Sequence, residues 1–244
     1  MTTTLEFEHT VVSRGEWLEA RKELLKQEKE LTRQRDKVCA ERRALPWVKV
    51  DKEYVFEGPG GKVTLADLFG KNSQLIIYHF MFDPSWEEGC PGCSFLSDHV
   101  DSARLHFENR DVSYAAVSRA PIAKLEAYKK RMGWKFPWVS SAESDFNYDY
   151  QVSFTDEQIA KGEAVYNYEP TTEAGECPGS SVFYKNAEGE IFHTYSAYAR
   201  GDEGTLGAFM WMDMTPKGRN EESTMNWIRR HDEYENAPEG GCCH

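Results

Sequence analysis

Residues 74–106 read QLIIYHFMFDPSWEEGCPGCSFLSDHVDSARLH and combine an apolar run, two cysteines and a helical pattern. Residues 75–82 form an apolar run rich in β-branched and aromatic side chains, which predicts a buried strand. After a turn at residues 83–85 comes the motif Cys90-Pro91-Gly92-Cys93. Apolar residues at helical spacing follow it, namely Phe95, Leu96, Val100 and Leu105. The sequence therefore predicts a C-x-x-C motif where a buried strand ends and an amphipathic helix begins.

The position of Cys90 at a helix start favours its reactive form. A helix N-terminus offers unpaired N–H groups and about half a positive charge, so a thiolate there is stabilised and its pKa falls. Cys93, one turn further in, is expected to be more buried and to attack a mixed disulfide formed at Cys90. Glu87 and Glu88 oppose the effect, because nearby negative charge raises the pKa of a thiol. The sequence leaves the balance between the two effects open.

Two other interpretations of the C-x-x-C motif stay open. The pair can belong to a zinc site, but such a site needs four ligands, and neither a second C-x-x-C nor an H-x-x-x-H is present. The pair can also be two inert buried thiols. The strand–motif–helix context favours a redox dithiol over both.

The length and composition indicate a globular protein with either one large domain or one domain with appendages. Of 244 residues, 40% are hydrophobic and 29% are charged, which is ordinary for this class. The formal charge of −12 argues against nucleic acid and anionic membranes as partners. No run reaches the ~18 apolar residues of a membrane helix, and the start shows no secretory signal. We therefore expect a cytoplasmic protein whose six cysteines are reduced or catalytic.

Residues 14–43 form the most charged stretch and contain no proline, which predicts a long helix. Ser13 is its expected cap, and Glu16 completes a capping box. One thin apolar stripe repeats every seven residues, at Trp17, Leu24, Leu31, Val38 and Leu45. We expect either a solvated helix laid across the domain or a dimerisation arm.

Strand and helix patterns alternate after the long helix. Strands are expected at residues 47–56, 62–64, 75–82, 112–117 and around 138–139. Helices are expected at residues 65–69, after the C-x-x-C motif, and at 121–133, 155–160, 205–213 and 225–231. The β-α-β-α-β order predicts a parallel sheet with right-handed crossovers, and residues 181–195 predict a hairpin. For the aromatic segment 145–154 we propose only that it walls the substrate cleft.

These features resemble the thioredoxin superfamily, in which C-x-x-C begins the first core helix. The resemblance implies an α/β fold, a thioredoxin-like three-layer sandwich, here with a long N-terminal helix. Residues 61–80 also resemble the alkyl-hydroperoxide-reductase/thiol-specific-antioxidant branch. Most of residues 14–235 resembles the family called domain of unknown function 899, through stretches such as ELTRQRD, YVFEGPGGKVTLADLF, GCPGCSF, RMGWKFPWVSS and RRHDEY. The resemblance to domain of unknown function 899 implies a dithiol–disulfide oxidoreductase.

The thioredoxin resemblance also implies roles for single residues. Trp86 lies four residues before Cys90, as an active-site tryptophan does in thioredoxins. His79 is the nearest match to their buried acid, but it is five residues too far from Cys90, and a satisfied core histidine is the alternative. Pro178 matches their cis-proline about one residue out of register. Cys177 is then either a third redox partner or an unrelated loop cysteine.

A peroxiredoxin assignment fits less well. That family requires P-x-x-x-T-x-x-C, in which the proline and threonine shape the peroxide pocket. Asp83 and Glu87 occupy those two positions before Cys90. The sequence therefore argues against peroxidase activity of this type.

The end of the chain reads Gly240-Gly241-Cys242-Cys243-His244. This vicinal pair resembles the C-terminal Cys-Cys of mercuric reductases, which passes metal or electrons to a buried dithiol; a disordered end with reactive thiols is the alternative. The expected organisation is thus a helical arm (1–45), a thioredoxin-like domain (46–235) and a cysteine-containing tail (236–244).

The sequence as a whole predicts a thiol–disulfide oxidoreductase with Cys90 as nucleophile and Cys93 as resolving thiol. It would act on protein or small-molecule disulfides with an external dithiol reductant, and needs no organic cofactor or metal. A homodimer through the N-terminal helix is one expectation. The alternatives are a soft-metal protein that binds copper or zinc through the pair with Cys177, His193 or the tail, and an interaction scaffold that uses the helical arm.

Overall fold

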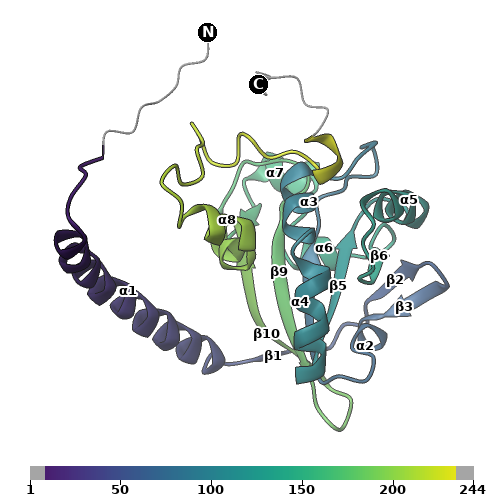
Figure 1. The fold of residues 1–244 in the computed structure, drawn as a ribbon. Coiled ribbons are helices and arrows are strands. Elements are labelled where there is room, and N and C mark those ends of the chain that lie inside the picture. Colours follow the sequence, from purple (N-terminus) through teal and green to yellow (C-terminus); the bar gives the residue numbers. More distant parts are fainter. Residues whose placement is uncertain (1–8, 235–244) are drawn as a thin grey trace. The chain divides into compact units, whose positions relative to one another are not determined.

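The computed structural model describes residues 9–234, and the chain divides into two compact units, residues 1–46 and 47–244. The first unit contains helix α1 (Arg14–Arg43) (Figure 1). Its predicted capping box is confirmed: the Ser13 side chain accepts from the Glu16 N–H, and the Glu16 carboxylate accepts from the Ser13 N–H at 2.9 Å. No helix among the described residues is both long and apolar enough to cross a membrane. The homodimer through α1 stays a prediction.

The second unit is built on an eight-stranded mixed sheet with the order β1-β10-β9-β4-β5-β6-β2-β3. Its strands are β1 (Val48–Lys49), β2 (Val55–Gly58), β3 (Gly61–Thr64), β4 (Gln74–His79), β5 (Val112–Ser118), β6 (Trp138–Ser140), β9 (Gly179–Lys185) and β10 (Ile191–Tyr198). The strands β4, β5 and β6 run parallel, as predicted, and the β9–β10 hairpin lies antiparallel to β4. A separate pair, β7 (Val165–Tyr166) and β8 (Glu169–Pro170), was not predicted.

Helices cover both faces of the sheet and give the three layers of a thioredoxin-like sandwich. On one face, here called the α3 face, lie α3 (Pro91–Ser97), α4 (Val100–Phe107) and α5 (Ile122–Met132). Figure 1 shows α3 and α4 in front of the strands. The opposite face, the α2 face, packs α2 (Leu65–Leu68) and α6 (Phe146–Asp149). Two further helices are α7 (Asp156–Lys161) and α8 (Gly207–Met212).

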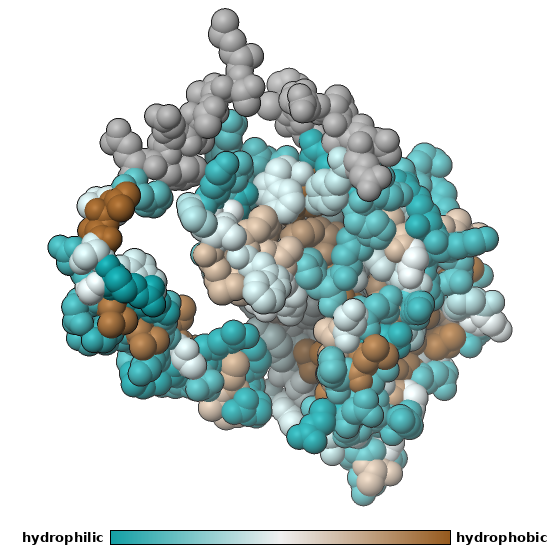
Figure 2. Space-filling view, viewed as in Figure 1, coloured by the Kyte–Doolittle hydropathy of each residue, from teal (hydrophilic) through white to brown (hydrophobic). Residues whose placement is uncertain are grey.

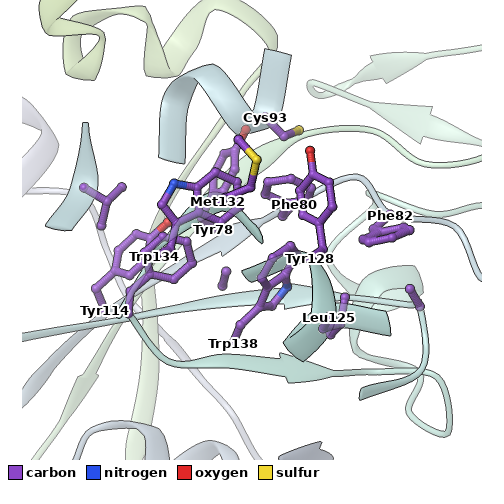
Figure 3. Packing of buried hydrophobic residues seen from close by; sticks show 14 residues of the cluster. Tyr78, Phe80, Phe82, Cys93, Tyr114, Leu125, Tyr128, Met132, Trp134 and Trp138 are labelled. Carbon is purple, nitrogen blue, oxygen red and sulfur yellow. The ribbon is translucent and has the colours of Figure 1, made fainter. Parts of the chain in front are cut away.

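Strand β4 supplies side chains to both cores, because successive residues of a strand point to opposite faces. Tyr78 and, directly after the end of β4, Phe80 lie in the α3-face cluster, while Leu75 and Ile77 lie in the α2-face cluster. Figure 3 shows the α3-face cluster, in which Tyr78 and Cys93 are packed with aromatic rings from α5 and β6. The C-x-x-C motif therefore belongs to the α3 face.

Three predicted elements differ in the structure. Residues 47–56 are not one strand but the separate strands β1 and β2. The helix after the motif ends at Ser97 and resumes at Val100, because the His99 ring bonds the Phe95 carbonyl at 2.7 Å, the acceptor that the next helical turn would use. The predicted helix at 225–231 is wrong: Met225 has a left-handed φ of 64°, which an α-helix does not allow.

Candidate active site

Cys90 is the N-cap residue of α3, and Pro91 occupies the first turn, where its missing N–H costs nothing. The Cys90 N–H donates to the Met81 carbonyl at 3.1 Å, and the Cys90 carbonyl accepts from the Ser94 N–H at 2.9 Å. The preceding residue has to be glycine: a Cβ at Gly89 would lie 2.6 Å from the Phe80 ring. Close packing against the strand end thus holds the motif loop in place.

The two motif cysteines differ in burial and in charge. Cys93 is buried in the α3-face cluster with 2% of its surface exposed, and Cys90 is partly exposed beside it. A hydrogen bond from the Cys93 side chain lowers the pKa of Cys90 to about 6, and the backbone N–H groups of Cys93 and Gly92 add to this against the effect of burial. Burial raises the pKa of Cys93 well above its usual value. Cys90 therefore carries the thiolate near neutral pH, and Cys93 keeps the proton.

The acidic residues before the motif do not reverse this balance, because cations neutralise them. Glu88 pairs with Arg230 at 3.0 Å and also with Arg131. Glu87 is exposed and lies 3.6 Å from Lys124. The question that the sequence left open is answered in favour of the thiolate.

Arg230 connects the C-terminal segment to the motif loop. Its Nη2 donates to the Gly89 carbonyl at 2.8 Å, and its Nε donates to the Tyr128 hydroxyl at 2.9 Å. The Tyr128 hydroxyl in turn bonds the Ser94 hydroxyl of α3 at 2.9 Å. The charge of Arg230 also helps to lower the pKa of Cys90. The sequence does not predict this role, although Arg230 lies in the stretch RRHDEY that carries the family resemblance.

Tyr78 is a second residue that the sequence did not single out. Its hydroxyl hydrogen-bonds the Cys93 sulfur, and the Met81 N–H donates to the same sulfur at 3.4 Å. Both contacts favour a thiolate on Cys93 and offset part of the cost of burial. The one available signal was the alternation of β4, which places Tyr78 on the face that carries the motif helix.

His79, the residue that the sequence compared with the buried acid of thioredoxins, lies on the opposite face from the dithiol. It is 1% exposed, its Nε2 bonds the Ser181 hydroxyl at 2.8 Å, and its ring stacks on Tyr150. Burial lowers the pKa of His79 to about 3, so the ring is neutral at ordinary pH. The structure thus places His79 in the core, as the alternative expected, but only one ring nitrogen is satisfied: the buried Nδ1 has no hydrogen-bond partner among the described residues.

A cavity of about 330 Å3 opens beside the dithiol. Cys90 and Cys93 line it, together with Tyr78 from β4 and Pro178 just before β9. Pro178 thus lies across from the motif as the resemblance implied. The cis bond predicted for it is wrong, since no peptide bond among the described residues is cis.

The other candidate residues lie away from the cavity. Cys177 is 5% exposed in a separate cluster with Phe154 and Ala164, and burial raises its pKa to about 12. Trp86 packs against the α3-face cluster without lining the cavity. His193 bonds Ser196 at 2.8 Å on β10.

The structure also bears on the metal-binding alternative and on the aromatic segment. Among residues 9–234, no group of three or more His, Cys, Asp or Glu side chains could hold a metal ion. Cys242, Cys243 and His244 lie outside the described residues. Segment 145–154 does not wall the cavity: Phe146 and Tyr150 pack in the α2-face cluster instead.

Comparison with known proteins gives a family and several remote structures. The model of a family described as "Bacterial protein of unknown function (DUF899)" matches residues 6–234. No curated protein matches the chain. The peroxidoxin BcpB of Mycobacterium tuberculosis shares 11% identity over 66% of this chain and 93% of its own, with a TM-score of 0.45. A peroxiredoxin Q structure from Xanthomonas campestris shares 17% identity over 68% and 96%, with a TM-score of 0.44.

A third structure is a cysteine-to-serine mutant of peroxiredoxin 6 from Arenicola marina. It shares 16% identity over 71% of this chain and 76% of its own, with a TM-score of 0.45. Likeness at this level carries no argument about activity.

Proposed function

The chain belongs to the bacterial protein family DUF899, and from the site that this member carries we propose that it is a thiol–disulfide oxidoreductase. Cys90 is the nucleophile and Cys93 the resolving thiol. The observation that supports this most directly is the asymmetry of two cysteines that line the same cavity: Cys90 is partly exposed and its pKa is lowered to about 6, whereas Cys93 is buried and its pKa is raised.

The reaction begins with the Cys90 thiolate, because the thiolate rather than the thiol attacks a disulfide. It attacks one sulfur of the substrate, the substrate S–S bond breaks, and the leaving sulfur takes a proton. A mixed disulfide now joins the substrate to Cys90. Cys93 next loses its proton and attacks the Cys90 sulfur, which releases the second substrate thiol and leaves a Cys90–Cys93 disulfide. An external dithiol then reduces this disulfide.

The second step requires a thiolate in a buried place, and the site contains the groups that stabilise one. The Tyr78 hydroxyl and the Met81 N–H both donate to the Cys93 sulfur. A hydrogen bond of this kind contributes about 1 kcal/mol. The two donors therefore lower the cost of forming the thiolate that burial would otherwise oppose.

The surroundings of Asp83 and Glu87 support a disulfide substrate over a peroxide. Asp83 accepts from the Ser85 hydroxyl at 2.6 Å, and the Glu87 side chain is exposed. Neither lines the cavity that Cys90 faces. The proline and threonine of a peroxide pocket thus have no counterpart at these two positions.

Trapping of the intermediate tests the proposal. The reduced Cys93→Ser variant is expected to form a stable mixed disulfide at Cys90 with a small disulfide, seen as an added mass on the peptide that contains residue 90. The Cys90→Ser variant is expected to lose disulfide reduction entirely, and Cys177→Ser serves as the matched control that retains it. Wild-type rates in both motif variants would refute the assignment.

A further inference from the structure

The cavity beside Cys90 has mainly apolar walls that come from two parts of the chain. Met81 and Leu96 belong to the motif region, while Leu206, Phe209 and Met225 belong to the segment after β10. Phe209 and Leu206 are also core residues of the cluster that joins this segment to Phe95 of α3. Figure 2 shows tan and brown side chains gathered where α8 lies beside α3.

The charged residues at the cavity are already paired within the protein. Asp202 accepts from the Ser180 hydroxyl at 3.0 Å, and Glu203 pairs with Arg200 at 2.7 Å and with Arg219. These carboxylates disfavour an anionic substrate. Arg200 is the only lysine or arginine among the described residues that line the cavity, and it forms an ion pair with Glu203. The walls therefore offer apolar contact and little charge recognition.

We propose that this cavity binds the apolar group of a small, uncharged organic disulfide, whose sulfur then lies next to Cys90. The inference rests on the proposed function and narrows its substrate from disulfides in general to this class. A volume of about 330 Å3 is at the lower end of ligand pockets, which span roughly 300–1,000 Å3, and suits a small organic group better than a folded polypeptide.

The chemical step is the one already described and balances without another reactant. The Cys90 sulfur forms a bond to the substrate sulfur that carries the bound alkyl group, and the substrate S–S bond breaks. Formation of the Cys90–Cys93 disulfide then releases that alkyl thiol. The protein dithiol is oxidised by two electrons, and the substrate disulfide is reduced to two thiols.

A single-turnover experiment with three disulfides of similar chain length tests the inference. The prereduced full-length protein is mixed with dipropyl disulfide, with hydroxyethyl disulfide or with dithiodipropionate, and formation of the Cys90–Cys93 disulfide is followed by alkylation and mass spectrometry. Each rate is divided by the rate at which dithiothreitol reduces the same compound, which removes differences in intrinsic reactivity.

Dipropyl disulfide is expected to react about tenfold faster than hydroxyethyl disulfide after this correction, because the cavity buries a methyl group in place of a hydroxyl. Dithiodipropionate is expected to be the slowest. Equal corrected rates for all three would overturn the inference and leave the proposed function intact. Absence of Cys90–Cys93 oxidation by any of them would overturn both.

Two matched variants locate the preference in the cavity. Met225→Glu introduces a charge into the wall and is expected to reduce the tenfold preference to about twofold or less. Met210→Glu makes the same change on exposed α8 surface outside the cavity lining, and should keep the preference. A preference that survives Met225→Glu unchanged would place the apolar contact elsewhere and refute the assignment.

Discussion

The tripeptide Cys-Pro-Gly occurs twice in this chain, at residues 90–92 and 177–179, and its two cysteines have opposite character. Cys90 begins a helix, where hydrogen bonds from Cys93 and from backbone N–H groups lower its pKa to about 6. Cys177 is buried beside β9, and burial together with the Glu173 carboxylate raises its pKa to about 12. The comparison teaches that hydrogen-bond donors and burial, rather than the local tripeptide, determine the reactivity of a cysteine.

Alkylation of the folded protein gives the largest expected difference. At pH 7 a thiol of pKa about 6 is about 90% thiolate, whereas one of pKa about 12 is ionised to roughly one part in 10⁵. A thiolate of low pKa is a weaker nucleophile, so the net expectation is that Cys90 reacts with iodoacetamide at least about a hundredfold faster than Cys177.

The pH profile of this reaction follows from the same shift. Because the pKa of Cys90 is lowered, its thiolate persists as the pH falls to about 6, and the rate then declines about tenfold per pH unit. Peptide mapping after labelling between pH 4 and pH 9 measures both sites in one sample. Comparable labelling of Cys90 and Cys177 in folded protein would refute the proposed difference in reactivity between the two cysteines.

Removal of the Arg230 guanidinium tests what lowers the pKa of Cys90. Arg230→Met deletes a positive charge and the bond to the Gly89 carbonyl, so the alkylation midpoint should move to higher pH. The rate at pH 6 should fall by up to about tenfold. Arg229→Met is the matched control, because the Arg229 guanidinium bonds the Ile228 carbonyl and Arg230, not Arg229, is the arginine whose charge lowers the pKa of Cys90. An equal shift in both variants would indicate a general loss of charge rather than a specific contact.

Removal of the Tyr78 hydroxyl should have a smaller effect than removal of Arg230, and it should act on the resolving step at Cys93. Tyr78→Phe removes one donor to the Cys93 sulfur, and resolution of the mixed disulfide should slow by about fivefold, as expected for one hydrogen bond of about 1 kcal/mol. Tyr114→Phe is the control, since the Tyr114 hydroxyl lies buried in the same cluster and has no hydrogen-bond partner within residues 9–234. Quenched-flow mass spectrometry of the mixed disulfide measures the step. If both variants resolve at the wild-type rate, Tyr78 has no part in the reaction.

The smallest effect should come from the surroundings of Cys177. Glu173→Gln removes a carboxylate that accepts a hydrogen bond from the Cys177 thiol at 3.5 Å. The pKa of Cys177 should fall, but only in part, because burial is the main cause of the raised pKa and is unchanged in this variant. Labelling of Cys177 at pH 8 should accelerate only about threefold. An increase to the rate of Cys90 would show that the carboxylate, and not burial, keeps this cysteine inert.

Sequence patterns predicted the elements whose causes are local. The capping box of Ser13 and Glu16, the buried β4 strand and the helix start at Cys90 each depend on residues within a few positions of one another. The family resemblance supplied the three-layer arrangement that brings distant strands together. These two sources gave the correct fold and the correct location of the motif.

The sequence did not predict the contacts that set the chemistry of the site. Gly89 and Arg230 meet across 141 positions of the chain, and only the packed fold brings them together. The thioredoxin resemblance pointed to His79, whereas its neighbour Tyr78 is the residue that packs with Cys93 and lines the cavity. The cis bond assigned to Pro178 was likewise carried over from a resemblance, and the structure corrects it.

Gly92, the central glycine of the motif, has a consequence for engineering of this protein. Exchange of the two residues between the cysteines is a direct way to change the reduction potential of a C-x-x-C pair. Here a Cβ at Gly92 would lie 3.2 Å from the Cε methyl of Met225, which lines the cavity. Any larger residue at this position therefore pushes into the space available to a ligand. A substitution that changes the reduction potential of the pair would thus also change how well a ligand fits the cavity.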